Sequence, residues 1–315
     1  MDRSGDASER NGSQELRETS VLLPFQPPYD WEAMLSFLAA RAVAGVEEVS
    51  QDMYRRRLDA EGTVEVAHDA AGGALAVVCR LPVDVEISAI LARVRRLFDV
   101  DADVATIGRS LARDPFLAPL VERRPGLRTP GAWDGFELAV RAILGQQVTL
   151  AAARLLAGRL VALCAAVARP GALSSFGAFP SAAQVLACDL GGLGMPAARR
   201  AALVALAEAS RDDATLFTRS EPLDDAVTRL RSIRGIGEWT AQYIALRALR
   251  ASDAFPASDV GLLRAAAAES GGRPTPAELL ARSEAWRPWR AYAAQHLWTE
   301  LASPRPNVAT GSPSI

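Results

Sequence analysis

L-R-S-I-R-G-I-G-E-W-T-A-Q-Y, at residues 230–243, is the stretch of this 315-residue chain that says most about its fold. Gly235 and Gly237 lie one residue apart, Ile233 and Ile236 flank the first of them, and a helical pattern follows. Glycine reaches positive φ and has no Cβ to keep a bound group away, so the pair predicts a tight turn between two short helices. Backbone amides at the start of a helix can bind a phosphate group. The stretch therefore predicts a helical hairpin with a phosphate-binding turn.

Two aromatic residues and a carboxylate accompany the turn. Trp239 and Tyr243 are four positions apart and so share one face of the second helix. Asp259 ends the segment F-P-A-S-D and precedes the helical run V-G-L-L-R-A-A-A. An aspartate there is a favoured helix N-cap, and a helix N-terminus also favours the ionised carboxylate, which can stabilise a developing positive charge. The residues alone leave both roles open for Asp259, and they leave core packing open for the two aromatics.

The composition is typical of a globular protein. With 50% hydrophobic residues the chain can bury a substantial core, and its length predicts two or three domains. No apolar run reaches the roughly 18 residues that span a bilayer, and the N-terminus is polar, so we expect neither a membrane anchor nor a signal peptide. Cys79, Cys164 and Cys188 are far apart and form no C-x-x-C pair. This spacing argues against a disulfide framework, a zinc site or an iron–sulfur cluster and favours a reducing cytoplasm.

Charge is divided unevenly along the chain, although the net charge is only −2. Residues 1–108 hold 11 Arg against 19 Asp and Glu, a net charge of −8, whereas residues 109–315 hold 24 Arg against 18, a net charge of +6. The basic part is the one that carries the hairpin, which favours a polyanionic partner. Every one of the 35 Lys and Arg residues is arginine. The chain therefore has no ε-amine and cannot form a lysine Schiff base.

Residue patterns divide the chain into two folded parts with polar tails. Residues 1–20 and 303–315 are rich in polar and turn-forming residues, so we expect disordered tails there. Residues 21–107 predict a small antiparallel α+β domain. Its expected elements are strands at Thr63–Ala67 and Ala74–Val78, with Val64 and Val66 on one face, a hairpin turn at Gly72-Gly73, and helices at Trp31–Ala44 and Val85–Phe98.

From residue 108 to residue 302 the pattern is almost entirely helical, with the helical hairpin at 228–243. Proline or glycine punctuates most junctions. The predicted helices are Phe136–Gly145, Val148–Val167, Ala182–Leu186, Ala197–Ala209, Leu223–Leu230, Glu238–Arg250, Val260–Glu269, Pro276–Ser283 and Trp289–Leu301.

Several sequence blocks, in order, resemble the helix-hairpin-helix superfamily of DNA glycosylases, specifically its 3-methyladenine DNA glycosylase II branch. The resemblance covers about residues 23–302 and rests on P-F-Q-P-P-Y-D-W-E-A-M-L-S-F-L-A-A-R-A at 24–42, R-L-F-D at 96–99, R-P-G-L-R-T-P-G at 124–131, R-A-I-L-G-Q-Q-V at 141–148, G-I-G-E-W-T-A at 235–241 and W-R-P-W-R-A-Y-A-A-Q-H-L-W at 286–298. It implies an α+β fold, with a small N-terminal antiparallel sheet-plus-helix domain beside a two-part all-helical core that holds the catalytic cleft.

The resemblance also implies roles for individual residues. Asp259 matches the catalytic aspartate of the family, and Trp239, Tyr243 and Trp298 match aromatics that line its base pocket. Trp239 stands where the superfamily's bifunctional members have a nucleophilic lysine, which implies a monofunctional enzyme that uses water. An aromatic pocket would select cationic alkylated bases by cation–π attraction. His296, two residues before Trp298, is expected to be structural or to donate a hydrogen bond in the pocket.

Further matched positions concern DNA and ions. Gly235, Gly237 and Thr240 match phosphate-contacting amides of the hairpin, and Gln147 matches the residue that fills the gap left by the extruded base. A monovalent cation on the backbone carbonyls of Arg231, Ile233 and Gly235 is implied by the family, and no cofactor is required. Two departures are visible: Gln147 replaces the leucine of some relatives, and Val260 stands where some relatives have tyrosine.

The resemblance thus implies a DNA-3-methyladenine glycosylase II that flips alkylated bases out of double-stranded DNA and hydrolyses their N-glycosidic bonds in base excision repair. Alternatives are the same fold with specificity for deaminated or oxidised bases, and a catalytically silent protein that binds damaged DNA. The expected location is the cytoplasm, associated with the nucleoid. Neither a membrane nor an obligate protein partner is expected.

Overall fold

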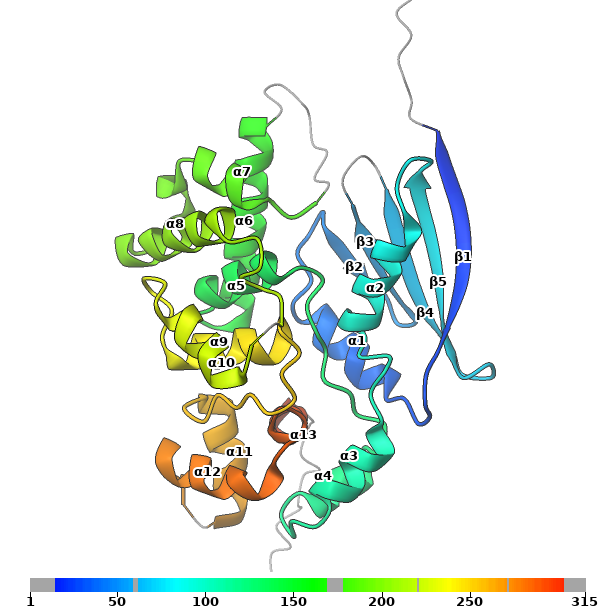
Figure 1. The fold of residues 1–315 in the computed structure, drawn as a ribbon, viewed down its shortest axis with the longest axis vertical. Helices are drawn as coiled ribbons and strands as arrows, with labels where there is room; N and C mark the ends of the chain where they lie inside the picture. Colours follow the sequence, from blue (N-terminus) through cyan, green and yellow to red (C-terminus); the bar gives the residue numbers. More distant parts are fainter. Residues whose placement is uncertain (1–14, 59–61, 169–177, 220, 271, 303–315) are drawn as a thin grey trace, which may run out of the picture.

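A five-stranded antiparallel sheet forms one side of the protein (Figure 1). The structure is a computed structural model and describes residues 15–58, 62–168, 178–219, 221–270 and 272–302. The sheet order is β1-β5-β4-β3-β2, and the strands are β1 (Leu16–Pro24), β2 (Glu47–Val49), β3 (Met53–Arg57), β4 (Thr63–Asp69) and β5 (Ala74–Pro82). Strands β4 and β5 form the predicted hairpin, with Gly73 in the turn at φ +61.

Sequence patterns predicted only two of the five strands. Strand β1 begins at Leu16, so residues 16–20 belong to the sheet and the expected tail of residues 1–20 is wrong there; residues 1–14 and 303–315 lie outside the described residues. Strand β1 turns Thr19, Val21 and Leu23 inward, but Leu22 between them is an exposed apolar residue, so the sequence shows no clear alternation. The expected alternation of β4 is confirmed, because Val64 and Val66 are both fully buried.

Helices α1 (Trp31–Ala39) and α2 (Ile87–Leu97) pack with the sheet around one hydrophobic core. Asp30 caps α1 by accepting a hydrogen bond from the amide of Ala33. Inward-facing side chains of β4 and β5 meet those of Val94 and Leu97 in this core. The predicted α+β character of the N-terminal part is therefore confirmed.

The remainder of the described chain is helical and shares a second core (Figure 1). All nine helices predicted there are present, with ends that differ by a few residues, and two short helices, α3 and α4, were not predicted. The helices are α3 (Val104–Leu111), α4 (Ala118–Arg123), α5 (Gly135–Leu144), α6 (Leu150–Ala168), α7 (Ala182–Ala187), α8 (Ala197–Asp212), α9 (Leu223–Arg231), α10 (Glu238–Arg247), α11 (Val260–Ser270), α12 (Pro276–Ser283) and α13 (Arg290–Ala302), with 3-10 turns η2 (Leu190–Leu193) and η3 (Glu284–Trp286).

Two expectations about composition need correction. The 18 residues Leu150–Val167 of α6 are long and apolar enough to cross a membrane, by length and composition only, as core helices of globular proteins also are. Cys164 on α6 and Cys188 after α7 are far apart in sequence but adjacent in space, with their Sγ atoms 2.7 Å apart. Both thiols are free in the structure.

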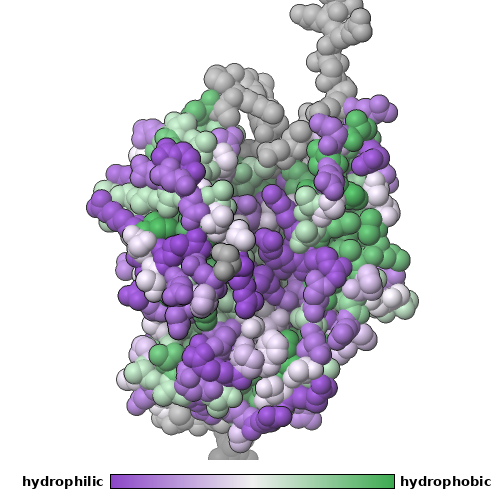
Figure 2. All heavy atoms as spheres, in the orientation of Figure 1, coloured by the Kyte–Doolittle hydropathy of each residue, from purple (hydrophilic) through white to green (hydrophobic). Residues whose placement is uncertain are grey.

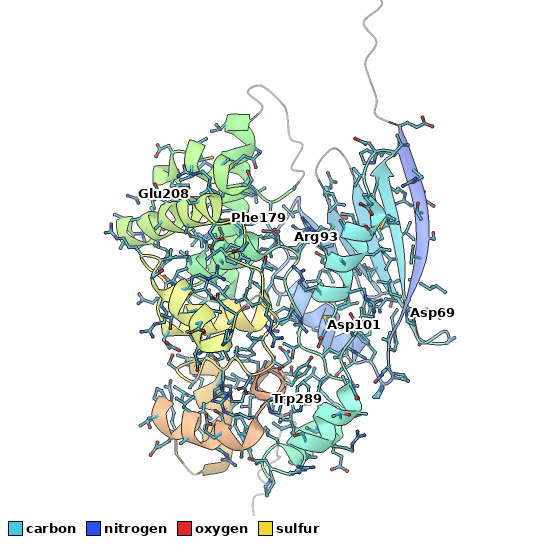
Figure 3. The ribbon with its side chains drawn as sticks, in the orientation of Figure 1. Asp69, Arg93, Asp101, Phe179, Glu208 and Trp289 are labelled. Atoms are coloured by element: carbon cyan, nitrogen blue, oxygen red, sulfur yellow. The ribbon has the colours of Figure 1, made fainter. Side chains whose placement is uncertain are left out.

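A buried ionic cluster joins the sheet to helix α5. Arg56 on β3 donates hydrogen bonds to Glu47 on β2 and to Glu137 on α5, and Arg141 on α5 donates to both carboxylates. Burial alone raises the pKa of Glu47, but the adjacent Arg141 and Arg56 lower it overall. On the face drawn in Figure 2, hydrophilic residues gather along the line where the two parts of the molecule meet. Figure 3 shows Arg93 of α2 and Phe179 on facing sides of this junction.

Candidate active site

Asp259 lies immediately before α11, where two tryptophans and a backbone amide hold its carboxylate. Trp239 of α10 donates its indole N–H to Oδ2, and Trp298 of α13 donates its indole N–H to Oδ1, each over 2.8 Å. The amide of Leu262 donates to Oδ1 over 3.0 Å. Asp259 is therefore the N-cap of α11. Its carboxylate is also fixed by three hydrogen-bond donors, one each from α10, α13 and α11. Half-burial leaves it accessible from the cavity that it lines.

The aromatic side chains form one assembly beside this carboxylate. The rings of Trp239 and Tyr243 stack, with centroids 5.4 Å apart and planes inclined by 8°. Trp298 meets Tyr243 edge to face, with centroids 6.3 Å apart. The helical spacing predicted for Trp239 and Tyr243 thus gives a common face, and α13 brings Trp298 to it. All three rings line the same cavity as Asp259.

Gly261 is the position that permits the contact between α11 and α13. A Cβ placed on Gly261 would lie 2.9 Å from Oδ1 of Asp259, 3.2 Å from Cδ1 of Trp298 and 3.4 Å from its Nε1. The first distance is shorter than real Cβ contacts allow, so a side chain there would displace the carboxylate or the indole. Sequence analysis did not single out Gly261.

The cavity has a volume of about 370 Å³ and extends from Asp259 to the junction with the sheet. This is the lower end of the size range of small-molecule sites. The lining residues come from α1, α5, α6, α10 and α13 and from the segments between them: Phe37, Leu38, Arg41, Val43, Glu47, Leu97, Gly131, Ala132, Trp133, Asp134, Glu137, Leu138, Arg141, Ala142, Gly145, Val148, Leu150, Ala153, Arg154, Ala157, Trp239, Tyr243, Arg247, Asp259 and Trp298.

Two arginines place positive charge beside the aromatic assembly. Arg247, one helical turn after Tyr243, has its guanidinium carbon 5.2 Å from the centroid of Trp298 and 5.6 Å from that of Tyr243. Arg41 on the N-terminal side lies over Phe37, 3.7 Å from its ring centroid. Burial alone raises the pKa of Tyr243, but the charges of Arg247 and Arg41 lower it overall.

The hairpin between α9 and α10 confirms one predicted glycine role and corrects the other. Gly235 has φ +88, and a Cβ there would lie 2.3 Å from the Cβ of Ala202. Gly237 has φ −84, so it does not supply positive φ as expected; it is the N-cap of α10. A Cβ on Gly237 would meet nothing within 4 Å, and no side chain caps α10. The first amides of α10 therefore face open space.

A second loop is tied to the hairpin. Gln146, after α5, donates from Nε2 to the carbonyl of Gly235 over 3.0 Å and to the hydroxyl of Thr240 over 3.1 Å. The adjacent Gln147 is exposed and has φ +57, a left-handed conformation that is strained for a residue other than glycine. The structure thus brings Gln147, Gly235, Gly237 and Thr240 together through Gln146.

The structure also shows which residues sequence analysis missed. Phe37 on α1 and Arg41 just after this helix reach the cavity from about 200 positions earlier in the sequence, and only the overall fold brings them there. Arg247 continues the four-residue spacing of Trp239 and Tyr243, so its place on the same helix face was visible in the sequence.

His296 is structural. It is buried, it does not line the cavity, and burial lowers its pKa to about 4. Within the described ranges, no group of three or more His, Cys, Asp and Glu side chains could hold a metal ion. The cation site expected from the sequence consists of backbone carbonyls and not of side chains. The carbonyl of Ile233 accepts a hydrogen bond from the amide of Ile236 over 3.0 Å, and the carbonyl of Gly235 accepts one from Gln146.

Comparison with known proteins relates the chain to glycosylases over most of its length. Residues 20–134 match the family model "AlkA N-terminal domain". The chain is 37% identical to DNA-3-methyladenine glycosylase 2 of Escherichia coli over 282 residues, which cover 88% of this chain and 95% of that protein. It is 41% identical to a probable bifunctional transcriptional activator/DNA repair enzyme AlkA of Mycobacterium tuberculosis; the match covers 90% of this chain but spans only 58% of the length of the relative.

Solved structures support the same fold. The 3-methyladenine DNA-glycosylase of Archaeoglobus fulgidus superposes with a TM-score of 0.75 at 21% identity and covers 90% of this chain and 98% of its own. An 8-oxoguanine glycosylase/lyase of Clostridium acetobutylicum superposes with a TM-score of 0.69 at 16% identity, covering 91% and 97%. These likenesses concern the fold. Together with the identity to the Escherichia coli protein over nearly its whole length, they show that this chain belongs to the DNA-3-methyladenine glycosylase II (AlkA) family of helix-hairpin-helix proteins.

Proposed function

We propose that this protein is a monofunctional DNA glycosylase that flips alkylated bases out of double-stranded DNA and hydrolyses their N-glycosidic bonds in base excision repair. The observation that carries the proposal is the carboxylate of Asp259, held by two indole N–H groups at the edge of an aromatic-lined cavity. The family relatives named for this activity support it. We expect the chain to divide into domains at residues 21–107 and 108–302, with this cavity at the side of the helical core.

The chemistry follows from the position of Asp259. The bond between C1′ of the sugar and the base nitrogen breaks, its electron pair stays on the base, and the sugar becomes an oxocarbenium-like cation. An ionised carboxylate stabilises that cation, because it is fixed before the charge develops. A water oxygen then bonds to C1′ and releases a proton to solvent. Water is the only co-reactant, so no cofactor is needed. Lysine is absent from the whole sequence, so β-elimination through a lysine Schiff base is not available.

DNA would be held by the two linked loops. The uncapped amides of α10 would bind a phosphate of the damaged strand, with Gly237 leaving room for it. Gln147, which is exposed, would enter the gap that the flipped base leaves. A monovalent cation on the carbonyls of Arg231, Ile233 and Gly235 is also part of the proposal, since a carbonyl oxygen with one hydrogen bond keeps a second lone pair. The substrate places the protein in the cytoplasm, at the nucleoid.

The test is an abasic-site assay on duplexes that carry 3-methyladenine or 7-methylguanine. Wild-type protein should release the free base and leave abasic sites that break only after alkali. Borohydride should trap no adduct beyond a trace from the N-terminal amine. Asp259→Asn should reduce the rate on the order of 100- to 1000-fold while duplex binding persists.

Asp103→Asn is the matched control, because Asp103 also caps a helix by accepting from a backbone amide, that of Thr106, but lies outside the cavity. It should leave the rate unchanged. Full activity of the Asp259→Asn protein, or strong borohydride trapping by the wild type, would show that the proposed mechanism is wrong.

A further inference from the structure

The cavity beside Asp259 holds a positive charge that the proposed reaction has not used. Arg247 is 1% exposed and lines the cavity. Its guanidinium lies among three aromatic rings, 4.6 Å from the centroid of Phe37, 5.2 Å from Trp298 and 5.6 Å from Tyr243. Two of these rings belong to the aromatic assembly at Asp259. The charge therefore lies next to the aromatic rings that would surround a flipped base beside Asp259.

Neutral acceptors, and no carboxylate, hold this guanidinium. Nη1 donates to the carbonyl of Pro130 over 2.9 Å, and Nη2 donates to Oε1 of Gln295 over 2.8 Å. Among the described residues, no Asp or Glu forms an ion pair with Arg247, in contrast to Arg250, which pairs with Asp99. Burial, with smaller contributions from Arg41 and Arg250, lowers the pKa of Arg247 to about 10. The side chain therefore remains charged at neutral pH, and within the described ranges no carboxylate is paired directly with it.

Such a field affects two classes of damaged base in opposite ways. A base that is neutral in DNA takes up the electron pair of the glycosidic bond and leaves as an anion, so its charge falls from zero toward −1. A base alkylated on a ring nitrogen carries +1 in DNA and leaves neutral. A nearby cation stabilises the transition state of the first class relative to the free substrate. The same cation destabilises the transition state of the second class, because the base there still carries part of its positive charge.

We propose that Arg247 determines specificity by its charge, favouring bases that leave as anions and restraining the preference of the aromatic assembly for cationic bases. This inference rests on the proposed glycosylase function. Gln295 is a positioning residue for Arg247, because its Oε1 accepts from Nη2 while its Nε2 donates to Thr299.

The two classes separate in kcat/KM and not in kcat. Once a base is bound, breaking the bond moves the same amount of charge onto either class, so Arg247 raises both bound-state rates alike. The two classes differ by one full unit of positive charge, which the cationic base carries when it enters the cavity. At about 6 Å and an effective dielectric constant of about 20, one unit charge corresponds to a factor on the order of 100. Solvent in the open cavity reduces this, so we expect a factor of about 10 to 100.

The experiment compares duplexes of one sequence that carry either hypoxanthine, a neutral base, or 7-methylguanine, a cationic one. Single-turnover rates are measured at enzyme concentrations below and above half-saturation. Arg247→Met keeps the length and apolar stem of the side chain but removes the charge. The ratio of kcat/KM for hypoxanthine over 7-methylguanine should fall about 10- to 100-fold, while the ratio of the saturated rates stays within about threefold of wild type. Arg247→Lys should restore the kcat/KM ratio.

A second variant covers the case in which Arg247→Met fails to fold. Gln295→Glu is nearly isosteric and places a carboxylate against the guanidinium, so it should shift the ratio in the same direction without removing the arginine. Arg250→Met is the matched control, because Arg250 is a nearby, half-buried arginine that does not line the cavity. It should change both rates by one common factor.

The outcomes are separable. A kcat/KM ratio unchanged within twofold in Arg247→Met and in Gln295→Glu would overturn the proposal and make Arg247 structural. A wild-type protein that releases 7-methylguanine but no hypoxanthine would also overturn it, while the glycosylase function would stand. A wild-type protein that releases neither base would contradict the proposed function itself.

Discussion

The indole N–H of Trp298 donates to Oδ1 of Asp259 over 2.8 Å, across 39 positions of sequence. This bond joins the first residue before α11 to the last helix of the fold, and Trp239 mirrors it from α10 on the other carboxylate oxygen. A pocket tryptophan of this kind has two tasks, because its ring lines the cavity while its N–H fixes the carboxylate. Replacing it therefore tests both at once unless the variants are chosen to separate them.

Trp298→Phe separates the two tasks, since phenylalanine keeps an aromatic face but has no N–H. We expect a fall in excision rate of about 10- to 100-fold for every base, the cost of one lost hydrogen bond to a charged group. The same change made in the Asp259→Asn protein should have little further effect, because the group that it orients is already disabled. Single-turnover rates of the four proteins complete the double-mutant cycle. Equal losses in both backgrounds would mean that the indole acts independently of the carboxylate.

Trp298→Leu then reports on the ring itself. Relative to Trp298→Phe it removes the π face, so a cation–π contribution to recognition should reduce excision of 7-methylguanine more than that of hypoxanthine. A purely structural ring would instead lower the melting temperature and reduce both rates in the same proportion.

Gly261→Ala should disturb the same hydrogen bond from the other side. The added Cβ would lie 2.9 Å from Oδ1 of Asp259 and 3.2 Å from the Trp298 ring, so one of them must move. A displacement of about 1 Å at a reacting group costs on the order of 100-fold in rate. Alanine raises helix propensity over glycine, so stability should fall little. Gly158→Ala on α6 is the matched control, because nothing lies within 4 Å of its Cβ. A normal rate in Gly261→Ala would show that the exact position of the carboxylate does not matter.

Sequence patterns predicted the site residues on α10 better than those that the other elements contribute. Trp239 and Tyr243 share one face of α10 by their four-residue spacing, which follows from local geometry, and Arg247, which sequence analysis missed, continues that spacing. Asp259 was visible as a capping residue, although its two indole donors depend on how three helices pack. Phe37 on α1 and Arg41 just after it could not be predicted from local pattern, since they reach the cavity only through the packing of the N-terminal part on the helical part, where the ionic cluster links Glu47 to Glu137.

The misses in the sheet also have physical causes. Strand β1 buries one face at Thr19, Val21 and Leu23, but the exposed Leu22 hides this alternation in the sequence, and β2 is only three residues long. The hairpin glycines look alike in sequence, yet only Gly235 needs positive φ. Whether a glycine serves the backbone conformation or leaves space for a ligand depends on its neighbours in space, and sequence spacing does not contain them.

That difference makes the two hairpin glycines a matched pair. Gly235→Ala should destabilise the fold by about 1–3 kcal/mol, because the residue is left-handed and its Cβ would collide with Ala202. Gly237→Val should fold with a nearly unchanged melting temperature, since its φ is −84 and its Cβ faces open space. The valine would push the phosphate away, so affinity should fall for damaged and undamaged duplexes alike. Thermal unfolding and fluorescence anisotropy measure the two effects. If Gly237→Val changed lesion preference and left affinity intact, the hairpin would not be the DNA anchor.

The two histidines give a prediction about acid stability. His296 is buried on α13, and burial lowers its pKa from 6.5 to about 4. The folded protein therefore holds His296 neutral at a pH where the unfolded chain already binds a proton, so stability is full above pH 6.5 and falls as the pH drops toward 4. Between pH 7 and pH 5 the loss should be about 2 kcal/mol from this residue. Urea unfolding at both pH values measures it, and in His296→Gln that part of the difference should disappear.

His68→Gln is the control for this effect. His68 stacks on Trp31 with ring centroids 5.7 Å apart and is only partly buried, although burial still lowers its pKa. The pH dependence of stability is set by how far a pKa differs between the folded and unfolded states. The partly buried His68 is perturbed less than the fully buried His296, so His68→Gln should keep most of the wild-type loss between pH 7 and pH 5. If the two variants behaved alike, acid sensitivity would arise elsewhere, for example from the buried Glu47, whose pKa its arginine partners lower, and His296 would not be the acid-sensitive group of α13.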